Sequence, residues 1–84
     1  MKAILILAGS YSSCKATELI WQEACRTENI ELETFDLTNK EGQELSSKLN
    51  VKSFPALIIN GKIVAVGHPD KTDALKIIKA IHLK

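Results

Sequence analysis

The chain has 84 residues, of which 45% are hydrophobic and 25% charged, and its formal net charge is +1. This length gives room for one domain, residues 1–84, with one modest core. Acids and bases are mixed along the chain, so no basic stripe indicates nucleic-acid binding and no acidic tail indicates a solvated partner-binding end. Two cysteines are too few for a disulfide scaffold, which favours a cytoplasmic setting.

The first predicted element is a strand over Ala3–Ala8, a continuous apolar run of strand length. We interpret this run as a buried strand and not as a secretory leader or membrane segment. It is short, and sequence typical of a folded domain follows it directly. A polar serine-rich loop comes next, and a helix from Cys14 to about Glu28 follows it. We expect that helix to pack through residues at helical spacing: Ala16, Leu19, Ile20, Trp21, Ala24 and Cys25.

A second strand is predicted over Glu31–Asp36, where strand formers are enriched. Thr38-x-x-Glu41 has the form of a capping box and should open a second helix that ends near Leu49-Asn50. Leu45 and Leu49 are the expected core contacts of this helix, and Gly42 allows a close approach to it.

A hairpin is predicted next, in which Ala56–Ile59 pairs antiparallel with Ile63–Val66. Asn60-Gly61 readily takes the two positive φ angles of a tight turn, and Pro55 is tolerated only at a strand's first residue, an edge or a bulge. Asp70 or Thr72 then caps a last helix whose apolar face is formed by Ala74, Leu75, Ile78 and Ile81.

The predicted order is therefore strand, helix, strand, helix, strand, strand, helix. A right-handed crossover makes the first two strands parallel, and the hairpin adds an antiparallel pair. Covering both faces with helices gives an α/β fold, a three-layer sandwich around a four-stranded mixed sheet.

This order, with a cysteine at the first helix start and a proline before the hairpin, resembles the thioredoxin superfamily, in particular its small glutaredoxin-like members. The resemblance covers essentially the whole chain and is most specific over residues 50–61, NVKSFPALIING, which resemble the family's cis-proline segment. Gly67 falls where the family keeps a small residue in the same groove. Ser13-Cys14-Lys15 matches the second half of the family's C-x-x-C-K motif.

The motif is degenerate, because Tyr11-Ser12-Ser13-Cys14 occupies the C-x-x-C positions and tyrosine stands in place of the attacking thiolate. Dithiol exchange needs one thiolate to attack and a second thiol to resolve the mixed disulfide. The first strand also lacks the family's buried acid. A less favoured register makes Cys14 the first residue of C-x-x-T, with Thr17 as the last.

Cys14 is the one catalytic candidate, and two interpretations stay open for it. In the first turn of a helix, with Lys15 nearby, its thiol could form mixed disulfides; equally, it could be a packed relic of the resolving position. Cys25 lies eleven residues later, about 16 Å along a helix, beyond disulfide reach. We expect it to be a small core residue.

The resemblance implies a groove lined by Phe54, Pro55 and Gly67, in which the backbone of Phe54 pairs with an extended peptide or with glutathione. Tyr11 either offers a ring to this groove or merely covers Cys14. Residues 67–70, Gly-His-Pro-Asp, loosely resemble the glutaredoxin element that holds glutathione, and Asp70 is equally a helix cap. His68 is expected to be solvated.

Two functions follow from these observations. The first is a single-cysteine thiol–disulfide protein whose Cys14 forms mixed disulfides with a protein or peptide partner, with glutathione as a candidate co-substrate. The second is a non-catalytic module that holds an extended peptide or protein partner in the groove. Residues 9–16 lack the second glycine and the Ser/Thr of a phosphate-binding loop, and neither histidine has a metal-ligating neighbour. We therefore predict no bound cofactor, metal, nucleic acid or membrane partner, and a monomer.

Overall fold

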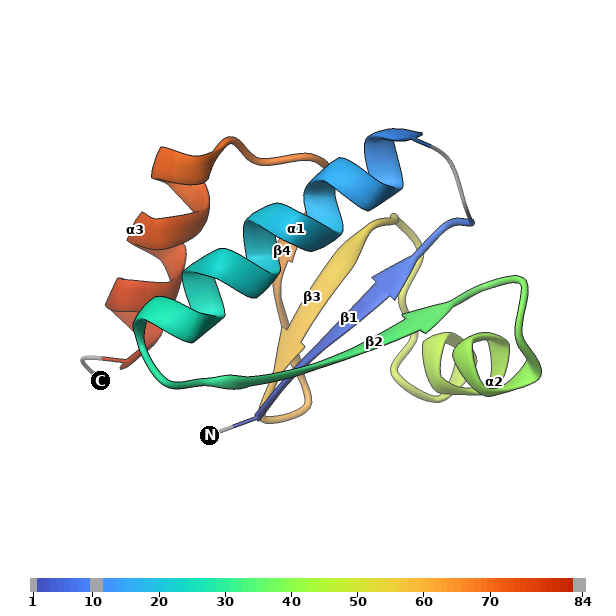
Figure 1. The fold of residues 1–84 in the computed structure, drawn as a ribbon. Coiled ribbons are helices and arrows are strands. Elements are labelled where there is room, and N and C mark those ends of the chain that lie inside the picture. Colours follow the sequence, from blue (N-terminus) through green and yellow to red (C-terminus); the bar gives the residue numbers. More distant parts are fainter. Residues whose placement is uncertain (1, 10–11, 83–84) are drawn as a thin grey trace.

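The computed structural model describes residues 2–9 and 12–82 and contains seven elements (Figure 1). They follow the predicted order, and their bounds are β1 Lys2–Leu7, α1 Ser12–Thr27, β2 Glu31–Asp36, α2 Lys40–Lys48, β3 Ala56–Ile59, β4 Lys62–Val66 and α3 Lys71–His82. Within these residues, no helix is long and apolar enough to cross a lipid bilayer.

The four strands form one mixed sheet in the order β2-β1-β3-β4. β1 and β2 are parallel, while β3 runs antiparallel to both β1 and β4. The predicted four-stranded mixed sheet is confirmed. The register sets Ala56 opposite Ile6, so Pro55 lies next to the end of β1, where the chain leaves the sheet towards α1.

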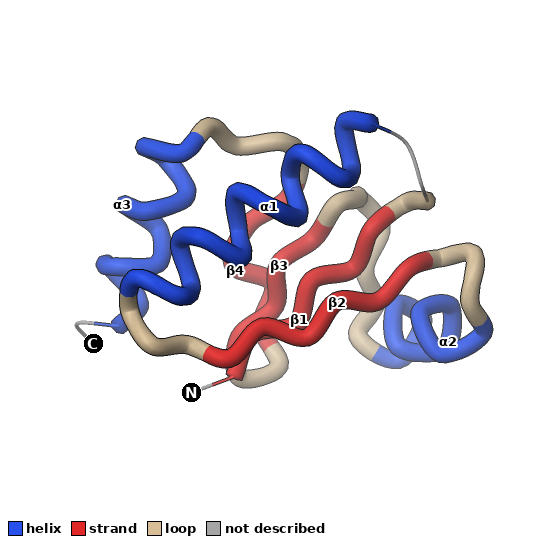
Figure 2. Tube along the Cα trace, viewed as in Figure 1, coloured by secondary structure: helices blue, strands red, loops and turns tan. Residues whose placement is uncertain are grey.

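Helices cover both faces of this sheet, as Figure 2 shows: α1 and α3 lie on one face and α2 on the other. Because strand side chains alternate between faces, β1 and β3 contribute to two separate cores. Ala3, Leu5, Leu7, Leu57 and Ile59 pack with α1 and α3. Ile6, Ala56 and Ile58 pack with Val51 and with residues around α2. The predicted three-layer sandwich is therefore confirmed.

The buried stripe of α1 differs from the prediction. Cys14, Thr17, Trp21, Ala24 and Cys25 are buried, whereas Ala16 is exposed and Leu19 is 64% exposed. The large Trp21 side chain is 1% exposed, and the residues three or four positions from it share its face. Hydropathy alone predicts that Leu19 is buried in preference to Thr17. The packing of Trp21 instead fixes which face of the helix is turned towards the core, and this face includes Thr17 and not Leu19.

The start of α2 also differs from the prediction. The N-cap is Asn39, which makes no side-chain capping bond, so Thr38 does not form the expected capping box. The amide of Thr38 donates instead to the carboxylate of Asp36, in a turn whose backbone bond joins Asn39 to Asp36 at 3.0 Å. That turn places the helix start one residue later.

The predicted close approach at Gly42 and the predicted contacts of Leu45 and Leu49 are confirmed. A Cβ on Gly42 would lie 2.2 Å from the carbonyl oxygen of Asp36, so only glycine fits there. Leu45 and Leu49 are partly buried against the core of the α2 face. The segment that runs from α2 to Pro55 is thereby held against the sheet.

The hairpin is confirmed, although β4 begins at Lys62 and not at Ile63. Asn60 and Gly61 have φ angles of 55° and 77°, as a tight hairpin turn requires. The amide of Asp73 donates to the carboxylate of Asp70 at 2.8 Å, so Asp70 is the residue that caps α3.

Candidate functional site

Pro55 and Gly67, two of the predicted groove residues, are hydrogen-bonded neighbours. The amide of Gly67 donates to the carbonyl of Pro55 at 2.8 Å, and the Phe54–Pro55 peptide bond is cis. Pro55 is fully buried, while Phe54 is partly buried against the core of the α2 face. This bond fixes the segment after β4 beside the residue that precedes β3.

Glycine at position 67 is explained by backbone conformation. Its φ is 87°, a region that L side chains rarely adopt, and a Cβ built there meets none of the described atoms within 4 Å. The resemblance suggested that a small residue is needed to line the groove. In the structure, the positive φ favours glycine at this turn.

The backbone of Phe54 is open to pairing. Among the described residues, neither its N–H nor its carbonyl has a hydrogen-bond partner, since the neighbouring bond to Gly67 uses the carbonyl of Pro55. An unpaired donor and acceptor at the end of a strand are the groups through which an extended peptide can add to a sheet. The backbone N–H and carbonyl of Phe54 are therefore candidates for pairing with an extended peptide.

Cys14 is the third residue of α1, and it is 2% exposed. Its side chain belongs to the core between α1, α3 and the sheet, together with Leu7 and Leu57. Ser12, Ser13 and Lys15 beside it are all exposed. Tyr11, which completes the predicted motif, lies outside the described residues. The start of α1 therefore presents hydroxyls and a lysine to solvent, while the sulfur faces inward.

Cys25 is buried and far along the same helix, as predicted. Burial raises the pKa of its thiol to about 11. Cys14 and Cys25 are both free. Their eleven-residue separation along α1 amounts to about 16 Å, so no disulfide joins them within the chain.

A contact that sequence reasoning missed ties the start of α1 to the groove. The hydroxyl of Thr17 is hydrogen-bonded to Nδ1 of His68 at 2.5 Å. Thr17 is 2% exposed, whereas His68 is exposed and was expected to be merely solvated. The spacing of Thr17 from Cys14 and Trp21 places it on the buried face of the helix, and a buried hydroxyl requires a partner.

These contacts form a continuous connection at one end of the sheet. Thr17, one turn after Cys14, bonds His68; His68 follows Gly67, and Gly67 bonds Pro55. Figure 1 shows the start of α1 at the same end of the sheet as the end of β1 and the start of β3. The structure therefore gathers Cys14, Pro55 and Gly67 at one end, although they lie far apart in sequence.

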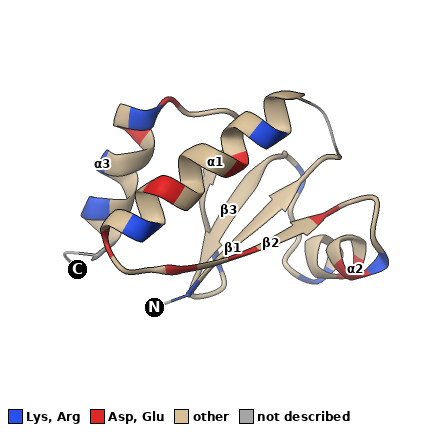
Figure 3. Ribbon diagram, viewed as in Figure 1, with Lys and Arg blue, Asp and Glu red and all other residues tan. Residues whose placement is uncertain are grey.

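The described first turn of α1 is basic in character. The first turn of α1 carries no acidic residue, and Lys15 follows Cys14. Elsewhere acids and bases are interspersed over the helices, as Figure 3 shows. The carboxylate of Asp70 is engaged in capping α3. Within the described part of the chain, no group of three His, Cys, Asp or Glu side chains is arranged to hold a metal ion.

Comparisons with known proteins agree with this architecture. Residues 2–79 match the family model described as a thioredoxin domain, so the chain belongs to the thioredoxin superfamily. Among curated protein sequences, none gives a significant match.

Two solved structures resemble the fold. The solution structure of oxidised thioredoxin from Plasmodium falciparum has a TM-score of 0.73 and 20% identity, over 96% of this chain and 80% of that one. A second structure, described as a malarial protein, has a TM-score of 0.71 and 24% identity, over 99% of this chain and 97% of that one. At these identities the likeness establishes the fold alone.

Proposed function

We propose that this thioredoxin-fold domain holds an extended segment of a protein partner along Phe54, Pro55 and Gly67, without dithiol exchange. The observation that carries the proposal is the contrast between its two candidate groups. The thiol of Cys14 is 2% exposed, while the backbone of Phe54 has no partner among the described residues. The site is thus better suited to backbone pairing than to thiol attack.

The loss of the dithiol pair supports the same conclusion. In the favoured register, Tyr11 replaces the first cysteine, and a phenol cannot attack a disulfide. Cys25 cannot substitute for it, because it is buried and its pKa is raised to about 11. A strand of the partner would instead exchange backbone hydrogen bonds with Phe54, and side-chain contacts beside Gly67 would provide selectivity.

The proposal is tested by peptide binding followed on backbone amides. Peptides selected from a random 12-residue display library should shift the amides of residues 53–55 and 67–68 in a heteronuclear NMR titration. Phe54→Pro removes the backbone N–H proposed to pair with the peptide and should weaken binding, whereas Phe54→Ala keeps that N–H and is the matched control. Shifts confined to other regions, or no selected peptides, would contradict the proposal.

A second candidate function is mixed-disulfide formation through Cys14, favoured by its place in the first turn of α1. The Cys14 thiolate would attack the disulfide of oxidised glutathione or of a partner; a new S–S bond forms and the other sulfur leaves as a thiolate. Glutathione thiolate would then release Cys14 by the reverse type of attack.

Alkylation of the folded chain with iodoacetamide distinguishes the two functions. Cys25 serves as the internal reference, because its raised pKa keeps the thiol protonated at pH 8. Equally slow modification of both cysteines supports the binding function alone. Modification of Cys14 more than about tenfold faster than Cys25, with a glutathione adduct at Cys14, would establish the thiol function.

A further inference from the structure

The outer face of α1 carries an unusual combination of exposed groups. We define it as the exposed residues Ser12, Lys15, Ala16, Leu19, Glu23 and Arg26, together with the half-buried Gln22. Leu19 lies at its centre and, at 64% exposure, exceeds the other exposed large hydrophobic residues, Ile63 at 44% and Val66 at 54%. Ala16 and Leu19 were expected to pack in the core, and the rotation of α1 leaves them in solvent instead.

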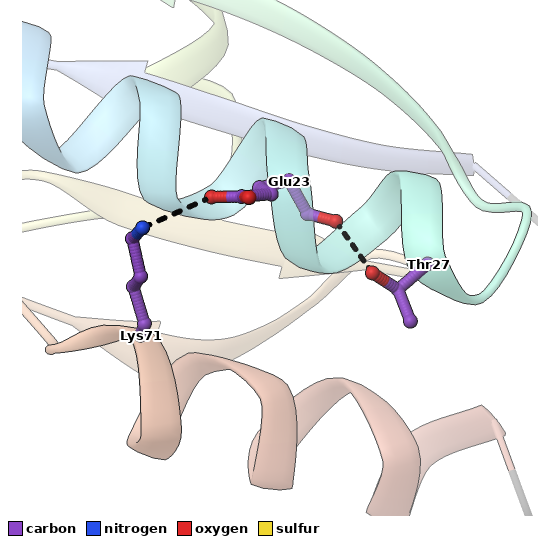
Figure 4. A network of polar contacts seen from close by, with 3 residues as sticks. All are labelled: Glu23, Thr27 and Lys71. Atoms are coloured by element: carbon purple, nitrogen blue, oxygen red, sulfur yellow. Dashed lines mark hydrogen bonds and ion pairs between the residues drawn. The ribbon is translucent and has the colours of Figure 1, made fainter.

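A hollow between α1 and α3 adjoins this face. Its apolar lining is formed by Ile20, Ala24 and Leu75. At its rim, Lys71 is paired with the carboxylate of Glu23 at 3.7 Å, and the hydroxyl of Thr27 donates to the Glu23 carbonyl at 3.0 Å, as drawn in Figure 4. Both charged side chains of the pair stay more than 60% exposed, so Glu23 remains accessible to a second cation.

The charges of the outer face are arranged symmetrically about Leu19. Lys15 lies four residues before it and Glu23 four residues after it, and all three point to the same side of the helix. When two such helices cross antiparallel about a two-fold axis at Leu19, Lys15 of each copy meets Glu23 of the other. Leu19 then faces Leu19, and Ala16 faces Gln22.

Other arrangements of the same two helices are disfavoured by charge. A parallel pair would set Lys15 against Lys15 and Glu23 against Glu23. An antiparallel pair shifted by three residues would set Lys15 against Arg26. Of these three arrangements, only the register centred on Leu19 pairs unlike charges while burying Leu19. The charge pattern of the face therefore disfavours the parallel pair and the shifted antiparallel pair.

We propose that two copies of this chain associate through the outer faces of α1, antiparallel and centred on Leu19. α1 has 16 residues and is about 24 Å long, so the contact falls below the size of a standard stable interface. The dimer is therefore weak, with a dissociation constant in the high micromolar range, and it departs from the monomer expected from the sequence. Its occupancy rises with concentration and falls with salt.

Sedimentation equilibrium of the full chain from about 10 µM to 1 mM, with reductant to prevent intermolecular disulfides, tests this proposal. Lys15→Glu and Glu23→Lys each create two like-charge contacts per dimer and should weaken association about tenfold or more. The double variant Lys15→Glu/Glu23→Lys exchanges the charges and should restore association to within about threefold. Lys40→Glu makes the same charge change on α2, across the sheet, and should have no effect.

Circular dichroism of each variant verifies that the fold is retained, which is expected because all three substituted positions are exposed. A wild-type chain that stays monomeric at 1 mM overturns the proposal. Single variants that associate as the wild type does, or a double variant that stays as weak as the singles, would overturn it as well.

Discussion

The hydroxyl of Thr17, in the second turn of α1, is hydrogen-bonded to Nδ1 of His68, fifty-one residues later in the chain. This bond joins the helix that carries Cys14 to the segment whose Gly67 amide is bonded to Pro55. Thr17 is buried, and no described buried side-chain nitrogen or oxygen lacks a partner. This hydrogen bond therefore links the start of α1 directly to the segment beside Pro55.

Removing the histidine should destabilise the fold. In His68→Ala the buried hydroxyl of Thr17 loses its partner, at a cost of about 1 to 3 kcal/mol in the free energy of unfolding. Thr17→Val should cost less, about 1 kcal/mol, because the exposed imidazole can bond to water.

Urea unfolding of both single variants and the double variant measures the coupling between the two side chains. In the Thr17→Val background, His68→Ala should cost clearly less than it does alone. Thr27→Val is the control, because its hydroxyl is exposed, and it should change stability by less than about 0.5 kcal/mol. Additive effects of the two substitutions would show that the bond contributes nothing.

Gly42→Ala should destabilise the domain although Gly42 lies in a helix. Alanine has the higher helix propensity, by about 1 kcal/mol, but its Cβ would lie 2.2 Å from a backbone oxygen of Asp36. Backbone cannot move aside cheaply, so we expect a net loss of about 2 kcal/mol or more. Thermal and urea unfolding measure it, and a variant as stable as the wild type would mean that α2 can move away from β2.

Asp70→Ala should remove the N-cap of α3 and cost about 1 kcal/mol in unfolding free energy. Asp70→Asn is the matched control, because an amide oxygen can accept the same bond from Asp73, and its stability should stay close to that of the wild type. If both variants lost equal stability, the charge of Asp70 and not the capping bond would be responsible.

Stability should fall between pH 9 and 11 because of Cys25. Burial raises the pKa of its thiol from 9.0 to about 11, so in this window the unfolded chain ionises while the folded chain holds its proton. The unfolded state is thereby favoured, and the contribution of Cys25, fully present below pH 9, should drop by roughly 2 kcal/mol by pH 11.

Cys25→Ala removes the ionisation of the Cys25 thiol and leaves the other titrating side chains unchanged. It should be less stable at pH 8, because it leaves a small cavity, yet lose less stability than the wild type when the pH is raised to 10.5. Parallel slopes for the two proteins in urea unfolding across this range would contradict the assignment.

The elements and their order were predictable from local pattern. A continuous apolar run and an enrichment in strand formers identified the first two strands, Asn60-Gly61 identified the hairpin turn, and Asp70 was one of two residues predicted to cap the last helix. The start of α2 was predicted wrongly because two local hydrogen-bonding arrangements compete for Thr38, a capping box and a turn with Asp36. Asp36 takes the amide of Thr38 in its own turn, which moves the start of α2 to Lys40 and makes Asn39 the N-cap.

The resemblance predicted that Cys14, Pro55 and Gly67 belong to the candidate site. It did not predict the contact between Thr17 and His68 that connects them. No local pattern indicated that Thr17 and His68 would meet, because their contact depends on how α1 sits over the sheet. Likewise, hydropathy assigned Leu19 to the core, and only packing around Trp21 determined that it faces solvent.

The sequence by itself determined the mixed sheet and its layers, because periodicity and turn chemistry are local properties. The tertiary structure decided that Cys14 is buried, that the Phe54 backbone has no partner among the described residues, and that α1 presents Lys15, Leu19 and Glu23 outward. The placement of the α1 residues among these depends on the rotation of that helix against the sheet. That rotation is set by the sum of many side-chain contacts between distant segments, which no single stretch of the chain encodes.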